Sequence, residues 1–194
     1  NTPEGDLPID IFGAHNLNNL AGAKWICQHM GVDEDDFYEA ISTFKGASKR
    51  LEKIVENKST LVFKDFAHSP SKVTATTNAV KSQYPDKTVV ACLELHTYSS
   101  LTPEFLTQYD ASLNQADEAV VFYSPEALNI KKLPPISEEQ IFEAFGKRDL
   151  KVFTNPEEFQ QYLKDMEYSN KVLLLMSSGN YGGLDFDEIQ NWVS

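Results

Sequence analysis

The chain has 194 residues, with 17 basic and 29 acidic side chains that give a formal net charge of −12. A composition of 41% hydrophobic and 24% charged residues is typical of a soluble globular protein and excludes a disordered chain. The acidic balance argues against nucleic acid as a partner, and the longest apolar run, residues 172–176, is too short to span a membrane.

The length suits one domain, or one domain with a piece of another. The chain begins at Asn1 without an initiator methionine, which indicates a cut end. Cys27 and Cys92 lie far apart in apolar segments, so we expect two buried free thiols in a reducing cytoplasm, with a disulfide as the alternative.

The first part of the chain is predicted to be helical. Apolar residues at the helical period predict a helix over residues 16–30, which Gly31 would end. Asp33 is placed to cap a second helix, which Gly46 would close. We place a boundary near residues 44–48, with a helical segment before it and an α/β domain after it.

The rest of the chain alternates between strands and helices. Residues 50–55 and 60–66 read as a hairpin, and further strands are predicted at 88–95, 118–123, 150–153 and 171–176. Helices are predicted at 71–84, 102–115, from 137 onwards, at 155–166 and after residue 183. The expected fold is a Rossmann-like, mostly parallel sheet flanked by helices, with an antiparallel hairpin element.

Two polar segments follow predicted strands, where ligands bind in open parallel sheets. The first holds Asp65 and His68, which could bind a ligand or move a proton; alternatively Asp65 caps the turn and His68 is a surface residue. The second places Glu94 and His96 beside several hydroxyl side chains, and its plain alternative is an ordinary polar loop.

Three further segments suggest ligand binding. The glycines at 179–183 could bring backbone amides to an anion, or could simply serve a turn with positive φ angles. Asn16 and Asn19 share one helix face and could read a purine edge, although capping explains Asn16 equally well. Lys49 and Arg50 form a candidate phosphate site, or a solvated basic turn.

The order of these segments resembles that of the Mur ligase family, which joins amino acids or peptides to UDP-N-acetylmuramate in bacterial cell-wall synthesis. His15, Asn16 and Asn19 are similar to the family pattern His-Asn-x-x-Asn, and residues 44–50 are similar to Phe-x-Gly-x-x-Arg-Arg, with Lys49 in place of the first arginine. Residues 65–70, Asp-Phe-Ala-His-Ser-Pro, are similar to Asp-(Tyr/Phe)-(Ala/Gly)-His-x-Pro.

Two details resemble the branch that reattaches a recycled murein tripeptide: Phe66, and the run at 176–184, similar to Met-Ser-Asn-Gly-x-Phe-Gly-Gly-Ile. The branch that adds L-alanine is the next closest. Its His-Arg-Tyr-Thr-Arg element corresponds to residues 96–100, which lack both arginines, and this mildly disfavours L-alanine.

The resemblance implies a role for each matching residue. His15, Asn16 and Asn19 would face the adenine of ATP, Arg50 the phosphates or ribose, and Asp65 the ribose. Asp65 and His68 would be catalytic, with Phe66 and His68 facing the incoming amine and the reacting carboxylate. The peptide pocket would be formed by Glu94, His96, Gly182 and Gly183.

The resemblance also implies how the chain is divided. No Gly-Lys-Ser/Thr phosphate loop is present, so residues 1–45 would be the helical tail of a central ATP-binding domain and 46–194 the C-terminal domain. Mg²⁺ would be bound mainly by upstream domains, and no metal ligand is assigned here. The expected partners are UDP-N-acetylmuramate, ATP and an amino acid or murein peptide, with no membrane. A non-catalytic binding module and a folate-directed ligase are the alternatives.

Overall fold

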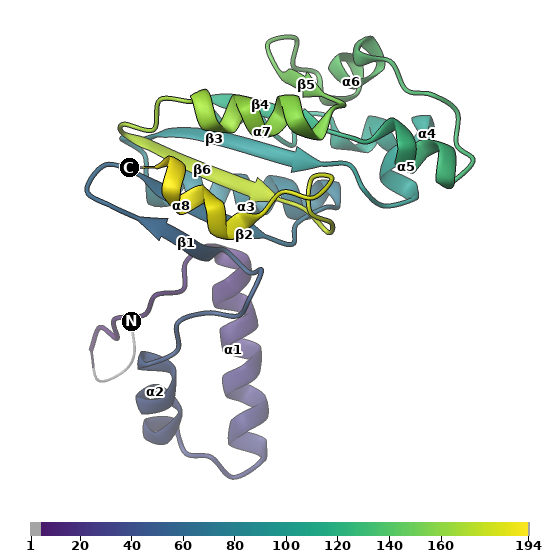
Figure 1. Cartoon of the computed structure of the whole chain (residues 1–194). Helices are drawn as coiled ribbons and strands as arrows, with labels where there is room; N and C mark the ends of the chain where they lie inside the picture. The colour runs from purple at the N-terminus through teal and green to yellow at the C-terminus, as the bar shows by residue number, and fades with distance from the viewer. Residues whose placement is uncertain (1–4, 194) are drawn as a thin grey trace.

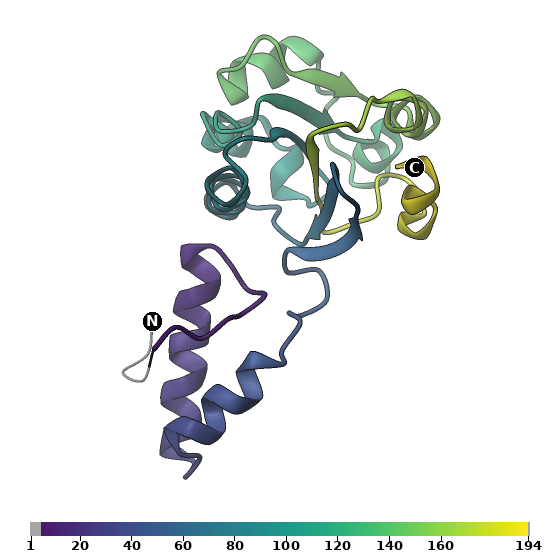
Figure 2. The ribbon, with the colours of Figure 1, turned by 90° about the vertical axis from the view of Figure 1, so that its left-hand side faces the viewer.

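A computed structural model describes residues 5–193 and contains a sheet domain from which a pair of helices extends (Figure 1). The pair consists of α1 (Ala14–His29) and α2 (Glu34–Ser42). Asp33 caps α2 as predicted, because its carboxylate accepts the backbone N–H of Asp36 at 2.9 Å. Figure 2 shows the pair pointing away from the sheet, and α1 accordingly buries none of its residues.

In the part of the chain that the structure describes, the sheet has six strands in the order β1-β2-β6-β3-β4-β5. Their bounds are β1 (Glu52–Glu56), β2 (Leu61–Asp65), β3 (Thr88–Glu94), β4 (Glu118–Phe122), β5 (Lys151–Phe153) and β6 (Lys171–Met176). Only β1 runs antiparallel, against β2, and every other neighbouring pair is parallel. The predicted fold class, with its antiparallel hairpin, is therefore confirmed.

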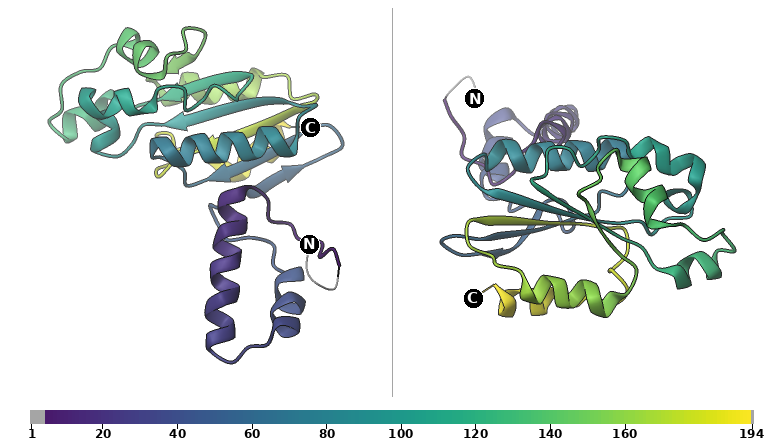
Figure 3. Two further views of the ribbon diagram at one scale, coloured as in Figure 1. Left: turned by 180° about the vertical axis from the view of Figure 1, so that it is seen from behind. Right: turned by 90° about the horizontal axis from the view of Figure 1, so that it is seen from above.

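Helices cover both faces of the sheet (Figure 3). One face packs against α3 (Pro70–Gln83), α4 (Pro103–Leu106), α5 (Pro125–Ile130) and α6 (Glu138–Phe145). The other packs against α7 (Pro156–Asp165) and α8 (Ile189–Trp192). Successive residues of β6 alternate between the two cores, which explains why this strand is apolar at nearly every position.

One helix prediction was wrong, and the last predicted helix is short. The helix expected over 102–115 is only α4 followed by the 3₁₀ turn η2 (Thr107–Tyr109). It stops because Ala111 has a φ of 59° and donates its N–H to the carbonyl of Phe145 instead of continuing the helical ladder. The helix expected after residue 183 is only the 3₁₀ turn η3 (Phe186–Glu188) and the four-residue α8.

Smaller differences concern caps, cysteines and a short helix. Gly46 does not close α2, which ends at Ser42, and α5 was not predicted although Ser124 caps it. Cys92 is a buried free thiol as expected, whereas Cys27 is free but only half-buried because α1 stands apart from the core. Within residues 5–193 no helix has both the length and the apolar character needed to cross a membrane.

Candidate functional site

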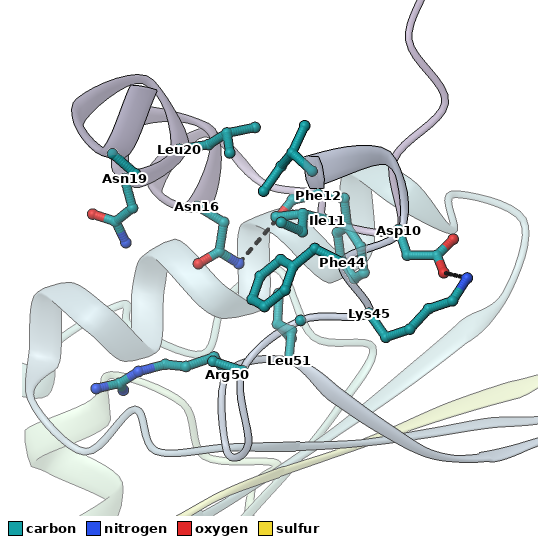
Figure 4. Close-up of a pocket in the computed structure, with 14 residues that line it drawn as sticks. Asp10, Ile11, Phe12, Asn16, Asn19, Leu20, Phe44, Lys45, Arg50 and Leu51 are labelled. Atoms are coloured by element: carbon teal, nitrogen blue, oxygen red, sulfur yellow. Dashed lines mark hydrogen bonds and ion pairs between the residues drawn. The ribbon is translucent and has the colours of Figure 1, made fainter. Parts of the chain in front are cut away.

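A pocket of about 430 Å³ lies where the helical pair joins the sheet domain (Figure 4). Its walls are largely apolar and include Leu20 and Phe44, while Asn16, Asn19 and Arg50 bring polar groups to it. Asn16 donates one amide hydrogen to the carbonyl of Phe12 at 3.1 Å, which fixes its side chain in the first turn of α1. An apolar cavity with a few fixed polar groups is the usual form of a small-molecule site.

A second pocket, of about 290 Å³, shares Asn16, Asn19 and Arg50 with the first. His15, Asp65 and Lys72 also line it and bring further polar and charged groups. The structure therefore brings together the five predicted cofactor residues, His15, Asn16, Asn19, Arg50 and Asp65. Sequence reasoning missed Lys72, which enters from the first turn of α3.

The surroundings of His15 favour the neutral form of its imidazole. Burial is the largest influence and lowers its pKa below the ordinary value of 6.5. The charge of Asp65 opposes this shift, and those of Lys72 and Arg50 add to it. A neutral imidazole can pack against the flat ring of a ligand without placing a positive charge beside it.

The turn that carries Arg50 is tied to the turn that follows β2. Lys49 and Leu51 have φ angles of 55° and 47°, a left-handed conformation that is uncommon outside glycine. Two bonds hold it: Phe66 N–H donates to the carbonyl of Lys49 at 2.9 Å, and Leu51 N–H donates to Asp65 Oδ2 at 2.7 Å. Arg50 is thereby held over the ring of Phe66, with its guanidinium carbon 5.4 Å from the ring centroid.

Asp65 organises this region. Its side chain is almost completely buried, and Oδ1 accepts the N–H of Ala67 at 2.7 Å while Oδ2 accepts that of Leu51. The carboxylate therefore connects the start of β1 with the exit of β2. It also lines the second pocket, where its remaining lone pairs can accept a hydrogen bond from a hydroxyl group.

His68 has one ring nitrogen available. Its Nδ1 lies 2.8 Å from the carbonyl oxygen of Phe66, and because a carbonyl can only accept, Nδ1 must carry the proton. In the neutral form of the ring, the lone pair is then on Nε2. The ring meets Phe66 edge-on, with centroids 5.1 Å apart, and the hydroxyl of Tyr109 donates to the backbone carbonyl of His68.

Glu94 and His96 form a second cluster at the same edge of the sheet. Asp65, Met176 and Leu93 lie level on β2, β6 and β3, so the residues that follow them emerge together. Ser177 joins the two sides, since its N–H donates to the carbonyl of Asp65 and its hydroxyl donates to the carboxylate of Glu94. Sequence reasoning missed the hydrogen bonds of Ser177 to Asp65 and Glu94, and that of Tyr109 to His68. No local sequence pattern predicts them, because each joins residues far apart in the chain.

The glycines of the loop after β6 have backbone angles or close contacts that disfavour a larger side chain. Gly182 and Gly183 have φ angles of 72° and 109°, and a Cβ on Gly182 would lie 2.5 Å from Pro156 at the start of α7. The close approach of Pro156 and the positive φ angle explain why position 182 is occupied by glycine. In the same loop, Gly179 lies directly against Glu94 and His96. Residues 5–193 contain no group of three or more His, Cys, Asp or Glu side chains that could hold a metal ion.

Comparison with known proteins identifies a matching family and curated relatives. The family described as "Mur ligase, glutamate ligase domain" matches residues 49–179. A curated UDP-N-acetylmuramate–L-alanine ligase from Brachyspira hyodysenteriae is 29% identical over 178 residues, which are 91% of this chain and 38% of that protein. The chain thus spans about two fifths of the length of the curated relatives it matches.

Solved structures share the fold. The UDP-N-acetylmuramate–alanine ligase of Thermotoga maritima aligns with a TM-score of 0.69 and 17% identity, covering 95% of this chain and 38% of that one. A murein peptide ligase from Psychrobacter arcticus gives a TM-score of 0.58 and 21% identity, covering 96% and 38%. The MurF ligase of Thermotoga maritima, solved in complex with ADP, gives 0.61 and 18%, covering 93% and 37%.

Proposed function

Because the chain belongs to the Mur ligase, glutamate ligase domain family, we propose that it is part of an ATP-dependent amide-bond-forming ligase. The ligase joins an amino acid or a peptide to the lactyl carboxylate of UDP-N-acetylmuramate in peptidoglycan synthesis or recycling. The names of the curated relatives and the fold of the solved ligases support this proposal.

The observation that carries the proposal is the pair of adjoining pockets that share Asn16, Asn19 and Arg50. The apolar pocket suits a purine ring between Leu20 and Phe44. The neighbouring pocket offers Arg50 and Lys72 to anionic groups, in a chain whose net charge is −12. A flat apolar base attached to a charged chain is the chemistry of a nucleotide, and the related fold of an ADP complex agrees with it.

We assign the nucleotide contacts accordingly. The amides of Asn16 and Asn19 hydrogen-bond the adenine edge, with the neutral ring of His15 beside the base. Arg50, held over Phe66, binds the phosphates or ribose, and Asp65 accepts a ribose hydroxyl. The strained, hydrogen-bonded turn at residues 49–51 fixes Arg50 before ATP arrives.

The proposed reaction has two steps. The lactyl carboxylate attacks the γ-phosphoryl group of ATP, which gives an acyl phosphate and ADP. The incoming amine then attacks the acyl carbon through a tetrahedral intermediate, and inorganic phosphate leaves. Phe66 and His68 face the reacting carboxylate and the amine, with Nε2 of His68 free to accept a hydrogen bond. Residues 5–193 contain no group of three or more His, Cys, Asp or Glu side chains that could hold a metal ion, and no step is assigned to Mg²⁺.

The division of the whole protein is part of the proposal. Residues 1–45 form the helical tail of an ATP-binding domain, and residues 46–194 form the C-terminal domain. The 194-residue chain alone is then inactive and binds ATP weakly, because most phosphate contacts come from other domains. Isothermal titration calorimetry tests this, and nanomolar ATP binding by the chain alone would contradict it.

Two amines fit the proposal. The resemblance of Phe66 and of the loop after β6 favours a murein tripeptide, whereas the curated relative from Brachyspira hyodysenteriae is an L-alanine ligase. A screen of L-alanine against the tripeptide, with the full-length protein, UDP-N-acetylmuramate and ATP, separates the two branches by phosphate release.

Substitutions test the site itself. In the full-length protein, Arg50→Ala and His68→Ala should each lower turnover at least tenfold, because one removes a phosphate contact and the other a group at the reacting carboxylate. Arg148→Ala and His29→Ala, which change exposed side chains away from both pockets, are the matched controls. Normal turnover in both site variants would disprove the site assignment.

A further inference from the structure

Glu94 is a buried carboxylate that has no lysine or arginine partner among residues 5–193. Only 3% of its side chain is exposed, at the carboxyl end of β3. Oε2 accepts the hydroxyl of Ser177 and the N–H of Tyr181, the latter at 2.9 Å. Among residues 5–193 its one ion-pair partner is His96. Burying a carboxylate is costly unless it is compensated, and the contact with His96 adds to the compensation that these two hydrogen bonds provide.

His96 is positioned between this carboxylate and solvent. Its Nδ1 lies 3.5 Å from Glu94 Oε1, and 45% of its side chain is exposed. The other titratable neighbour, Tyr181, does not compete, because its buried hydroxyl bonds to the backbone carbonyls of Cys92 and Met176. A carboxylate facing Nδ1 favours the tautomer in which Nδ1 carries the proton and Nε2 keeps a lone pair.

Gly179 leaves the space in which the pair meets. A Cβ at this position would lie 2.8 Å from Glu94 Oε2 and 2.9 Å from His96 Nδ1. The φ angle of Gly179 is not in the left-handed region, so the requirement for glycine comes from this close approach and not from the backbone. The N–H of Gly179 also donates to the hydroxyl of Ser177 at 2.6 Å, which ties the loop to the same carboxylate.

The cluster lies beside the proposed reaction centre. Only β6 separates β3 from β2, so Glu94 is roughly 10 Å across the sheet from the turn of Asp65 and His68. Ser177 bridges that distance by bonding to both sides. Arg50 and His68 therefore lie beside the end of β2, and the imidazole of His96 lies beside the end of β3. A substrate bound next to Arg50 and His68 would be near this imidazole.

We propose that Glu94 is a positioning residue that holds His96 in its Nδ1–H tautomer, so that Nε2 takes a proton from the incoming ammonium group. The amine nitrogen then forms its bond to the acyl carbon, and the bond from that carbon to the phosphate oxygen breaks. Of the two protons left on the nitrogen, one leaves with the phosphate as hydrogen phosphate and the other stays on the amide. This inference rests on the proposed function, and it assigns the deprotonation step to a pair of residues.

The tautomer can be measured without any activity. Long-range ¹⁵N–¹H NMR of the 194-residue chain, in alkaline solution where the ring is neutral, should show His96 protonated on Nδ1. Glu94→Gln should shift His96 towards the Nε2–H form, while Glu118→Gln, a carboxylate at the opposite end of the sheet, should leave it unchanged. An Nε2–H ring in the unsubstituted chain, or the same tautomer in Glu94→Gln, would overturn the proposal.

Kinetics of the full-length protein test the deprotonation. Glu94→Gln and His96→Ala should lower amide formation by at least tenfold, since general base catalysis typically contributes about 10²–10⁴-fold. The KM for ATP should not change. Hydroxylamine, a nucleophile already unprotonated at neutral pH, should trap the acyl phosphate equally fast in all variants because it needs no base.

The outcomes separate the two hypotheses. Equal loss of the amide and hydroxamate reactions in Glu94→Gln would mean that Glu94 is merely structural, and the inference would be wrong. If the unsubstituted protein forms no hydroxamate, the proposed function fails, while the NMR measurement still decides whether Glu94 orients His96.

Discussion

The hydroxyl of Tyr109 holds the backbone of the His68 turn. Tyr109 is fully buried and donates to the carbonyl of His68, 41 residues away in the sequence. Tyr109→Phe should lower the free energy of unfolding by about 1 kcal/mol, because a buried carbonyl loses its donor. It should also lower turnover of the full-length protein, since His68 is no longer fixed beside Phe66. Urea unfolding and phosphate release measure the two effects.

Tyr123 provides the matched control for this prediction. It is also buried, and its hydroxyl donates to the carbonyl of Ile136 at 2.7 Å, away from His68. Tyr123→Phe should cost a similar free energy of unfolding and leave turnover unchanged. Equal turnover in the two variants would show that Tyr109 contributes only to stability.

At the scale of the elements, two glycines should respond to substitution in opposite directions. Gly179→Ala forces a methyl group against Glu94 and His96 in the loop after β6, so we expect a loss of stability of about 1–3 kcal/mol. Gly22 lies within α1, where an added methyl group would meet no neighbouring atom within 4 Å, so Gly22→Ala should increase the helical stability of α1 by up to about 1 kcal/mol. Chemical denaturation and circular dichroism measure both, and a stabilising Gly179→Ala would refute the close packing.

Glu118 connects the amino ends of three strands. Its carboxylate lies 2.8 Å from Lys171 on β6 and 3.3 Å from Lys151 on β5. The hydrogen bond from Lys171 is the largest influence and lowers the pKa of Glu118 below 4.5, although burial opposes it. Since the folded pKa is the lower one, the stabilisation is present above the unfolded pKa of 4.5 and disappears as the pH falls through the folded value.

Glu118→Gln should therefore lower the free energy of unfolding by about 0.5–1 kcal/mol at neutral pH, a small value because these groups are partly exposed to solvent. The difference from the unsubstituted chain should vanish in acid. Urea unfolding at neutral pH and at about pH 3 tests this, with the exposed Glu167→Gln as the control. A difference that grows in acid would contradict the lowered pKa.

On the scale of the whole molecule, the two parts of the chain should open independently. The sheet domain has a core on each face, whereas α1 buries no residue and Phe37 is the buried residue of α2. Backbone amides of β3 and β6 should therefore exchange with deuterium at least tenfold more slowly than those near the far end of α1. Mass spectrometry of deuterium exchange measures this, and equal protection would mean that the helical pair is stabilised by more than its local hydrogen bonds.

The sequence predicted what depends on short-range patterns. The strand at 171–176 was predicted at its observed bounds, because burial on both faces leaves a continuous apolar run. The five residues proposed to bind the nucleotide line one pocket, and their segments carry recognisable chemistry in the sequence. The helix over 102–115 was wrong because a distant carbonyl, that of Phe145, competes for the N–H of Ala111. Tyr109, Lys72 and Ser177 were missed for the same reason: their contacts join segments far apart in the sequence.

The two free cysteines give this molecule a built-in probe of its own unfolding. Cys92 lies at the centre of the sheet, and burial raises the pKa of its thiol well above the ordinary value, so an alkylating reagent can reach a reactive thiolate only when the sheet opens. Cys27 lies half-exposed on α1 and should be labelled much sooner. The rates at which the two thiols are labelled therefore report separately on the helical pair and on the sheet, without any engineered label.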